Sequence, residues 1–288
     1  MAAKSKRDGK HRKSIADALR VRGGSVNLSK LDAGATPGVR DKQEAAERLA
    51  ANLALIDELQ YRLYSEGRRS LLLVFQGMDA AGKDGVIRKV ATAFNPQGCH
   101  VWSFKVPTPD EAGHDFLWRI HKHAPRKGEF AIFNRSHYED VLVVRVHNLV
   151  PKNVWSARYA IINEFEHHLN EHGTTILKFY LHIDRDEQLE RMRERLEDPA
   201  KNWKFSEGDL NERERWDDYE AAFEDLLGRC STKHAPWFVI PANRKWYRDV
   251  AVSEIVAGAL AEMNPRPPEV KLDLKRLRAR LARDGSDG

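Results

Sequence analysis

A short apolar run that leads directly into a glycine-rich turn constrains this fold more than any other part of the sequence. The run spans residues 71–75, and Gly77, Gly82 and Lys83 follow it at the spacing G-x-x-x-x-G-K. Such a run is typical of a buried strand, and residues 86–94 favour a helix. Strand, glycine loop and helix in this order predict a phosphate-binding loop, whose backbone N–H groups and lysine hold phosphate. A chance glycine turn is the alternative, and the two flanking elements argue against it.

Two carboxylates distinguish this loop from most loops of its kind. Asp84 occupies the position at which a serine or threonine normally gives its hydroxyl to Mg²⁺, and Asp79 lies inside the loop. A carboxylate beside bound phosphates is repelled unless a cation lies between them, so we expect Asp79 to hold Mg²⁺. The loop residues expected to bind phosphate or nucleotide are Gly77, Met78, Ala80, Ala81, Gly82, Lys83, Asp84 and Gly85.

The composition is that of a soluble globular protein. The chain has 288 residues, 41% of them hydrophobic and 32% charged, which suits one large domain with a sizeable core. Its apolar runs reach about five residues, far short of a membrane span, and the basic start has no apolar segment behind it that would form a secretory signal. Cys99 and Cys230 form no C-x-x-C pair. We therefore expect free thiols and a cytoplasmic protein.

The positive net charge belongs to the two ends of the chain. The total is +5, but residues 1–22 carry a surplus of six positive charges and residues 264–288 a surplus of three, which leaves the rest near −4. This distribution argues against nucleic-acid binding. We expect basic, mobile tails at 1–24 and 264–288 around one body at 25–263, because charged segments without aromatic residues are usually solvated. Either tail can instead hold a polyanion.

Strand-like and helical segments alternate along the body. Predicted strands cover 71–75, 100–105, 129–133, 174–183 and 237–240, and predicted helices cover 42–66, 86–94, 109–121, a stretch ending at 146, 151–171 and 245–262. Parallel strands need such helical crossovers, so the pattern predicts an α/β fold with a five-stranded parallel sheet sandwiched by helices.

A second polar cluster follows the predicted strand at 129–133. Open α/β sheets bind ligands at this end of their strands. In enzymes with a phosphate-binding loop, a carboxylate after such a strand holds Mg²⁺ directly or through water, and Asn134 occupies that position here. An amide oxygen alone is a weak ligand, but Asp79 and Asn134 together can position a magnesium ion that keeps several waters.

The residues after Asn134 allow two interpretations each. Arg135 has the geometry to bind a phosphate with two hydrogen bonds, or to form a salt bridge with Glu139 or Asp140. His137 has no partner at metal-ligand spacing, so a packed histidine is favoured over a catalytic base.

A third cluster crowds basic residues around a proline break. Arg191 and Arg195 are four residues apart and project from one helical face, and Lys201, Trp203 and Lys204 follow. In a phosphoryl-transfer enzyme a mobile lid brings such arginines over the transferring group, and a tryptophan there can stack on a base. A surface helix covered with salt bridges is the alternative.

These motifs, in this order, resemble those of the family-2 polyphosphate kinases over roughly residues 25–270. The matching segments are Gly77–Gly85, Asn134–Asp140, Arg195–Lys204, Trp216–Tyr219, Pro236–Trp237 and Pro241–Tyr247. The resemblance implies a P-loop kinase fold with a helical lid at about 196–218. The family's catalytic positions fall on Asp79, Lys83, Asn134, Arg135 and Arg195, although the commonest family form has aspartate at position 134.

The resemblance also implies substrates and partners. It implies transfer of a phosphoryl group between inorganic polyphosphate and a nucleotide with Mg²⁺, or Mn²⁺ in its place, and a homo-oligomer. Adenine nucleotides are the expected acceptors, with guanine nucleotides as further candidates, and the segment around Glu139 resembles the branch that accepts nucleoside monophosphates as well as diphosphates. Candidates for a basic polyphosphate path are Lys89, Lys105, Arg126, Lys201, Arg244 and Lys245.

Two rival functions stay open. An ATP-dependent nucleoside monophosphate kinase would share the loop, fold and lid, but Asp84 counts against it because such kinases keep serine or threonine there. A non-catalytic nucleotide- or polyphosphate-binding protein is favoured only by Asn134.

Overall fold

The protein is built around a parallel five-stranded sheet. The computed structural model describes residues 14–269 and 271–284. The strands are β1 (Ser70–Gln76), β2 (Cys99–Ser103), β3 (Phe130–Asn134), β4 (Thr174–His182) and β5 (Trp237–Pro241), in the spatial order β2-β3-β1-β4-β5. Every adjacent pair is parallel. The predicted α/β fold with five parallel strands is confirmed.

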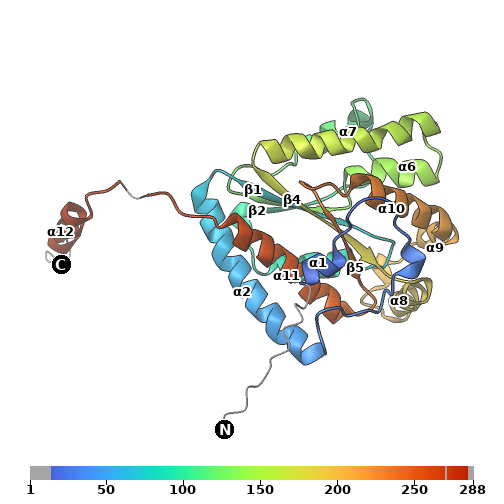
Figure 1. Ribbon diagram of the computed structural model, residues 1–288, viewed down its shortest axis with the longest axis horizontal. Coiled ribbons are helices and arrows are strands. Elements are labelled where there is room, and N and C mark those ends of the chain that lie inside the picture. Colours follow the sequence, from blue (N-terminus) through green and yellow to red (C-terminus); the bar gives the residue numbers. More distant parts are fainter. Residues whose placement is uncertain (1–13, 270, 285–288) are drawn as a thin grey trace, which may run out of the picture.

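Helices cover both faces of the sheet (Figure 1). One layer contains α2 (Lys42–Glu66), α3 (Lys83–Ala91) and α11 (Lys245–Met263), and the other contains α6 (Val143–Val146), α7 (Lys152–Glu171) and α10 (Trp216–Cys230). The remaining helices are α1 (Ile15–Leu19), α4 (Pro109–Ala112), α5 (Trp118–His121), α8 (Arg185–Glu197), α9 (Glu207–Glu214) and α12 (Leu274–Asp284), with 3₁₀ turns η1 (Leu28–Lys30), η2 (Pro96–Gly98), η3 (His137–Val141) and η4 (Asn202–Lys204).

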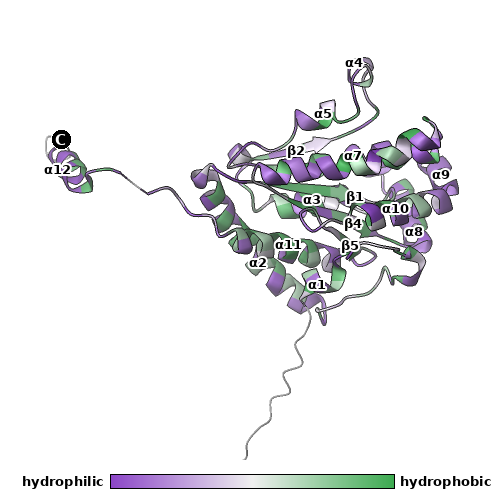
Figure 2. Cartoon of the chain, turned by 45° about the horizontal axis from the view of Figure 1, so that its top comes forward, coloured by the Kyte–Doolittle hydropathy of each residue, from purple (hydrophilic) through white to green (hydrophobic). Residues whose placement is uncertain are grey.

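The core lies between these layers. Figure 2 shows the central strands as a hydrophobic layer and the outer helical surfaces as largely hydrophilic. All residues of β1 are buried, and this strand pairs with β3 on one side and β4 on the other. Burial on both faces explains its continuous apolar run. The segment after β1 therefore emerges at the middle of the sheet's carboxyl edge.

Two predicted helices are interrupted. The helix expected at 109–121 is two short helices, because a capping box at Thr108 starts α4 and the side chain of Asp115 accepts a hydrogen bond from Leu117 N to start a new turn. The helix expected to end at Val146 is η3 followed by α6, and the break falls at Leu142, whose backbone leaves the helical region. Apolar spacing does not reveal such local hydrogen bonds.

The N-terminal boundary differs from the expected one. Ile15 and Leu19 of α1 are buried in the core, Arg20 forms an antiparallel bridge to Phe238, and Val21 N donates to the carbonyl of Trp237. Residues 14–24 therefore pack against the body instead of belonging to a tail. The rest of the expected tail, 1–13, lies outside the described residues.

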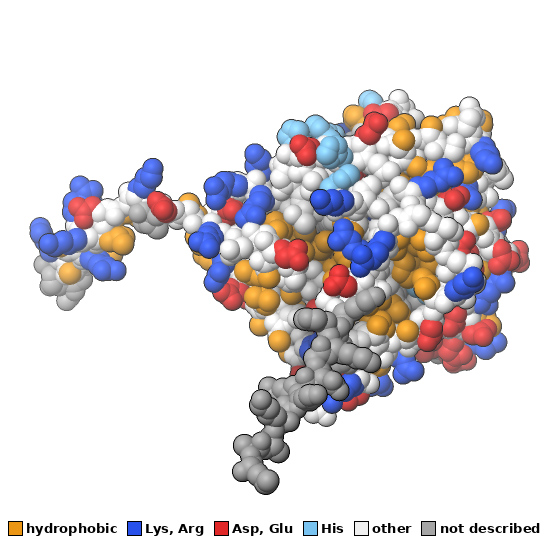
Figure 3. Space-filling model, viewed as in Figure 1, with side chains coloured by type: hydrophobic (Ala, Val, Ile, Leu, Met, Phe, Trp, Pro, Cys, Tyr) orange, Lys and Arg blue, Asp and Glu red, His pale blue; other side chains and the backbone are white. Residues whose placement is uncertain are grey.

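The C-terminal segment lies apart from the body. Figure 1 shows α12 at the end of an extended connection, and Figure 3 shows mostly basic side chains on it, whereas basic and acidic side chains are interspersed on the body. Within the described residues, no helix has the length and apolar character that crossing a membrane requires.

Candidate active site

A cleft of about 1490 Å³ opens at the carboxyl ends of β1 and β3. Most of the predicted site residues line it, namely Gly77, Met78, Asp79, Ala80, Gly82, Lys83, Asp84, Gly85, Asn134, Arg135, Glu139, Arg195, Lys201, Trp203 and Lys204. Ala81 is fully buried and is not part of this wall. Three clusters that are far apart in the sequence thus meet at one place.

Glycine is required at both ends of the loop. Gly77 has φ 156°, and a Cβ there would lie 2.8 Å from the carbonyl oxygen of Leu181. Gly82 has φ 97°, and a Cβ there would collide with the guanidinium of Arg248. The loop can therefore follow this path only with glycine at these positions. The spacing of the glycines predicted the loop correctly because a side chain at either position would collide with its neighbours.

Arg191 supports the loop from behind. Its Nη1 donates to the carbonyls of Ala80 at 2.9 Å and Ala81 at 3.0 Å, and its Nη2 donates to the carbonyl of Ala242 at 2.6 Å. The sequence interpretation placed Arg191 beside Arg195 above the transferring group, and this is wrong for Arg191. It is 5% exposed and holds backbone carbonyls, so it fixes the shape of the loop. Helical spacing alone does not tell which part of α8 meets the loop.

Lys83 starts α3 and folds back over the loop. Its Nζ donates to the carbonyls of Gly77 at 2.7 Å and Met78 at 3.2 Å. Burial, with repulsion from Arg135 as a smaller cause, lowers the pKa of Lys83 to about 8. This ammonium therefore lies over the loop that the sequence predicts to bind phosphate, with a pKa well below that of an ordinary lysine.

We expect kcat/KM for phosphoryl transfer to fall as the pH rises through about 8. The pKa of Lys83 is lowered, so the charged form that binds phosphate predominates below about pH 8 and is lost above it. A pH–rate profile from pH 6 to 10 measures this. The residual activity of a Lys83→Ala variant provides the control, because it should not fall over the same range. A wild-type profile that stays flat to pH 10 would contradict the assignment.

Arg135 lies between two carboxylates. It has φ 63°, a left-handed conformation that is rare for a side chain of this size. Its Nη2 donates to Asp79 Oδ1 at 2.6 Å, and its Nη1 lies 3.5 Å from Glu139 Oε2. Asp140, the other predicted partner, pairs with Arg158 at 3.0 Å instead. The guanidinium is held in the cleft with Asp79 as its main partner.

The oxygen donors in the cleft suit a hard cation. Asn134 Nδ2 donates to Asp84 Oδ1 at 2.6 Å, so the amide orients this carboxylate. Asp79 and Asp84 then supply two carboxylates near the loop. Among residues 14–269 and 271–284, no group of three or more His, Cys, Asp or Glu side chains has metal-binding geometry. A small donor set suits Mg²⁺, which usually keeps waters and binds substrate phosphates as well.

The end of α8 and the segment after it line the same cleft as the loop. Arg195 Nη1 lies 3.5 Å from Asp209 Oδ2 of α9. Burial raises the pKa of Asp209, and the charge of Asp79 raises it further, while Arg195 opposes both. Trp203 is 76% exposed, and Lys204 Nζ lies 5.0 Å from the centre of its ring. Arg195 thus pairs with a carboxylate that feels the charge of Asp79, whereas Trp203 presents an exposed ring to the cleft.

Two kinds of surface line the rest of the cleft. One is basic and includes Arg88, Lys89, Lys105, Arg119, Lys201, Lys245 and Arg248, and the other is apolar and includes Leu142, Val143, Val144, Leu149, Trp216 and Phe223. Of the expected basic path, Arg126 and Arg244 are absent from this wall, and Arg244 Nε donates to the carbonyl of Gly34 instead. The apolar wall was not predicted, because its residues read as ordinary core positions.

A phosphate-binding loop after the central strand of a parallel sheet, with an arginine-bearing helical segment across the cleft, defines a P-loop phosphotransferase. The sequence matches the family model described as polyphosphate kinase 2 over residues 39–268. The chain therefore belongs to the polyphosphate kinase 2 family.

Relatives with known names support this membership. An AMP/ADP-polyphosphate phosphotransferase of Meiothermus ruber is 54% identical over 79% of this chain and 85% of the relative. An ADP-polyphosphate phosphotransferase of Rhodopseudomonas palustris is 43% identical over 86% of this chain and 90% of the relative. The crystal structure of polyphosphate kinase 2 from Arthrobacter aurescens matches with a TM-score of 0.91 at 44% identity, covering 94% of this chain and 98% of that one.

Proposed function

We propose that the protein transfers phosphoryl groups between inorganic polyphosphate and adenine nucleotides. Lys83 and the loop amides, with Arg135 beside them between Asp79 and Glu139, carry this conclusion, because such a cleft stabilises a migrating phosphoryl group. The relatives named for AMP and ADP support both nucleotides as acceptors.

No protein nucleophile is needed for this reaction. An oxygen of the nucleotide's terminal phosphate attacks the end phosphorus of polyphosphate, and the bond to the rest of the polymer breaks, which leaves it one phosphate shorter. Lys83 and the loop bind phosphate oxygens, and Arg135 and Arg195 neutralise charge as the group moves. Asp79, with Asp84 and Asn134, would hold a divalent cation, which when bound neutralises phosphate charge.

Finer features of this function are part of the proposal. Enzymes of this kind use a divalent cation, and the oxygen-only donor set favours Mg²⁺, with Mn²⁺ as a substitute. Glu139 faces Arg135 and adds negative charge, which disfavours a second acceptor phosphate and so favours AMP relative to ADP. Guanine nucleotides as acceptors, a cytoplasmic location, a homo-oligomer and a lid at about 196–218 complete the proposal.

One assay tests the function. The protein is incubated with polyphosphate, Mg²⁺ and AMP, ADP or GDP in turn, without ATP. We expect AMP to give ADP and then ATP, because the cleft holds a polyphosphate donor and a nucleotide acceptor together. Product only after ATP is added would identify an ATP-dependent monophosphate kinase. Binding without any product would identify a non-catalytic binding protein.

A further inference from the structure

A buried polar network lies directly beneath η3, the turn that follows β3. It contains His137 and Tyr138 of η3, Glu166 of α7 and Lys178 of β4, and all four side chains are fully buried. Lys178 Nζ lies 2.5 Å from Glu166 Oε2 and donates to the hydroxyl of Tyr138 at 2.8 Å. A buried ion pair often stabilises the folded protein no more than apolar side chains of similar size would. We therefore consider a role for this network other than stability.

Three of these four side chains, those of Tyr138, Glu166 and Lys178, have every polar atom paired, whereas His137 Nδ1 has no hydrogen-bond partner among the described residues. Lys178 also donates to the carbonyl of Cys230 at 2.7 Å, which gives its ammonium three acceptors. The hydroxyl of Tyr138 donates to Glu166 Oε1 at 2.8 Å, and His137 Nε2 lies 3.1 Å from the same oxygen. Paired groups in a low-dielectric interior favour one geometry strongly, because any shift leaves a buried charge without a partner.

The turn above the network, η3, and the segment that leads into it carry residues of the cleft. Arg135 and Glu139 line the cleft, while the two residues between them in η3, His137 and Tyr138, point into the core. Arg135 keeps a left-handed backbone conformation that its neighbours must stabilise. Arg135 leads directly into this turn, so a turn held from below restrains the backbone from which the guanidinium extends.

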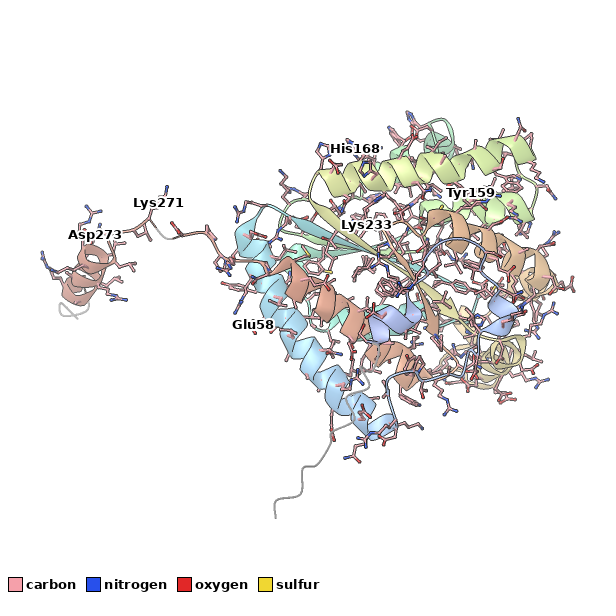
Figure 4. The ribbon with its side chains drawn as sticks, in the orientation of Figure 1. Glu58, Tyr159, His168, Lys233, Lys271 and Asp273 are labelled. Atoms are coloured by element: carbon pink, nitrogen blue, oxygen red, sulfur yellow. The ribbon has the colours of Figure 1, made fainter. Side chains whose placement is uncertain are left out.

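Helix α7 holds this turn at a second point as well. Arg158 Nη1 donates to both the backbone carbonyl and the Oδ1 atom of Asp140, each at 3.0 Å. Among the described residues, none from α7 lines the cleft. Figure 4 shows α7 as a long helix across one face of the body, with Tyr159 and His168 along it. Its contacts with η3 link it to the site only indirectly.

We propose that Tyr138, Glu166 and Lys178 are positioning residues for phosphoryl transfer, which act by holding Arg135 in the orientation that meets Asp79 and the migrating group. This inference rests on the proposed function. Positioning contributes to phosphoryl transfer because the reaction depends on charge placed in advance where the transition state needs it. The network provides such placement from outside the cleft.

The test is a double-mutant cycle with Tyr138→Phe and Arg135→Lys. Tyr138→Phe removes one buried hydroxyl and keeps the ring. We expect kcat to fall about fivefold, with KM for polyphosphate within about twofold, because the loss of two hydrogen bonds, to Glu166 and from Lys178, loosens the turn without removing a substrate contact. In the Arg135→Lys background the same substitution should lower kcat by less than about twofold, because the group being positioned is already changed.

Tyr159→Phe is the matched control. Tyr159 is also buried, and its hydroxyl accepts a hydrogen bond from Arg145 at 3.3 Å and makes none with η3 among the described residues. We expect this variant to keep the wild-type kcat. Thermal unfolding of each variant shows whether stability changes to a similar extent. A kcat loss confined to Tyr138→Phe at a temperature where all variants are folded then separates positioning from general weakening of the core.

Several outcomes would overturn the inference. One is an equal loss from Tyr138→Phe in both Arg135 backgrounds, and another is an equal loss in Tyr159→Phe. The unmodified protein is assayed first, so an absence of turnover with polyphosphate counts against the proposed function alone. In that case the ADP affinities of the four proteins in the cycle are compared instead, and additive changes in affinity would overturn the positioning role.

Discussion

Lys83→Ala is expected to lower kcat at least about 100-fold, because it removes a preorganised charge from the transition state. The fold should survive, since among the described residues the Lys83 ammonium hydrogen-bonds only to the carbonyls of Gly77 and Met78, and those groups can bind water in the cleft. Steady-state rates with polyphosphate and ADP measure the loss, and the thermal unfolding midpoint shows that the variant is folded.

Lys89→Ala provides the matched control for this substitution. Lys89 lies on the same helix, α3, and lines the same cleft, but it is exposed and makes no contact with the loop carbonyls. We expect a higher KM for polyphosphate and little change in kcat. Near-normal turnover in Lys83→Ala, or equal losses in both variants, would show that the glycine loop is not the catalytic phosphate site.

Asp79→Asn is expected to lower activity by about 100-fold or more at a low concentration of Mg²⁺. Neutral amides hold a hard cation poorly, and the loss of bound cation removes charge neutralisation that contributes several kcal/mol. The substitution also weakens the 2.6 Å contact to Arg135 Nη2. Initial rates measured across a wide range of Mg²⁺ concentration give the apparent metal affinity of each protein.

The dependence on metal concentration separates the two roles of Asp79. If it binds the cation, excess Mg²⁺ or Mn²⁺ should restore part of the activity of Asp79→Asn. If it acts only by holding Arg135, no concentration of metal will restore activity, and the apparent metal affinity will match that of the wild type. The second result would remove Asp79 from the predicted metal ligands.

The parts of the structure that could be predicted are those that a short stretch of sequence determines. The loop from Gly77 to Lys83 was found because its path excludes any side chain at two glycines, so its spacing is a steric requirement. The parallel sheet followed from apolar runs separated by helices. Arg135 and Glu139 were placed near the loop because strand ends meet at one edge of such a sheet.

Contacts made by distant segments were not predictable. Arg191 meets the loop only because α8 packs behind it, and helical spacing did not separate this residue from Arg195. Asn134 and Asp84 are 50 residues apart, and their hydrogen bond appears only when β1 and β3 lie side by side. That Asp79 and Asn134 bind the metal ion stays a prediction. The hydrogen bond from Asn134 adds Asp84 to the proposed ligands.

The antiparallel contact of the N-terminal segment with β5 has a consequence for how the chain folds. Ser231 Oγ donates to the carbonyl of Val21 across 210 residues, so the segment around Val21 meets a partner that is synthesised much later. Contacts this distant in sequence slow folding. Until β5 and α11 have been synthesised, the side of α1 that packs against them stays uncovered. The nascent chain therefore exposes part of the apolar side of α1 while about 210 further residues are added, a period in which chaperones have access to it.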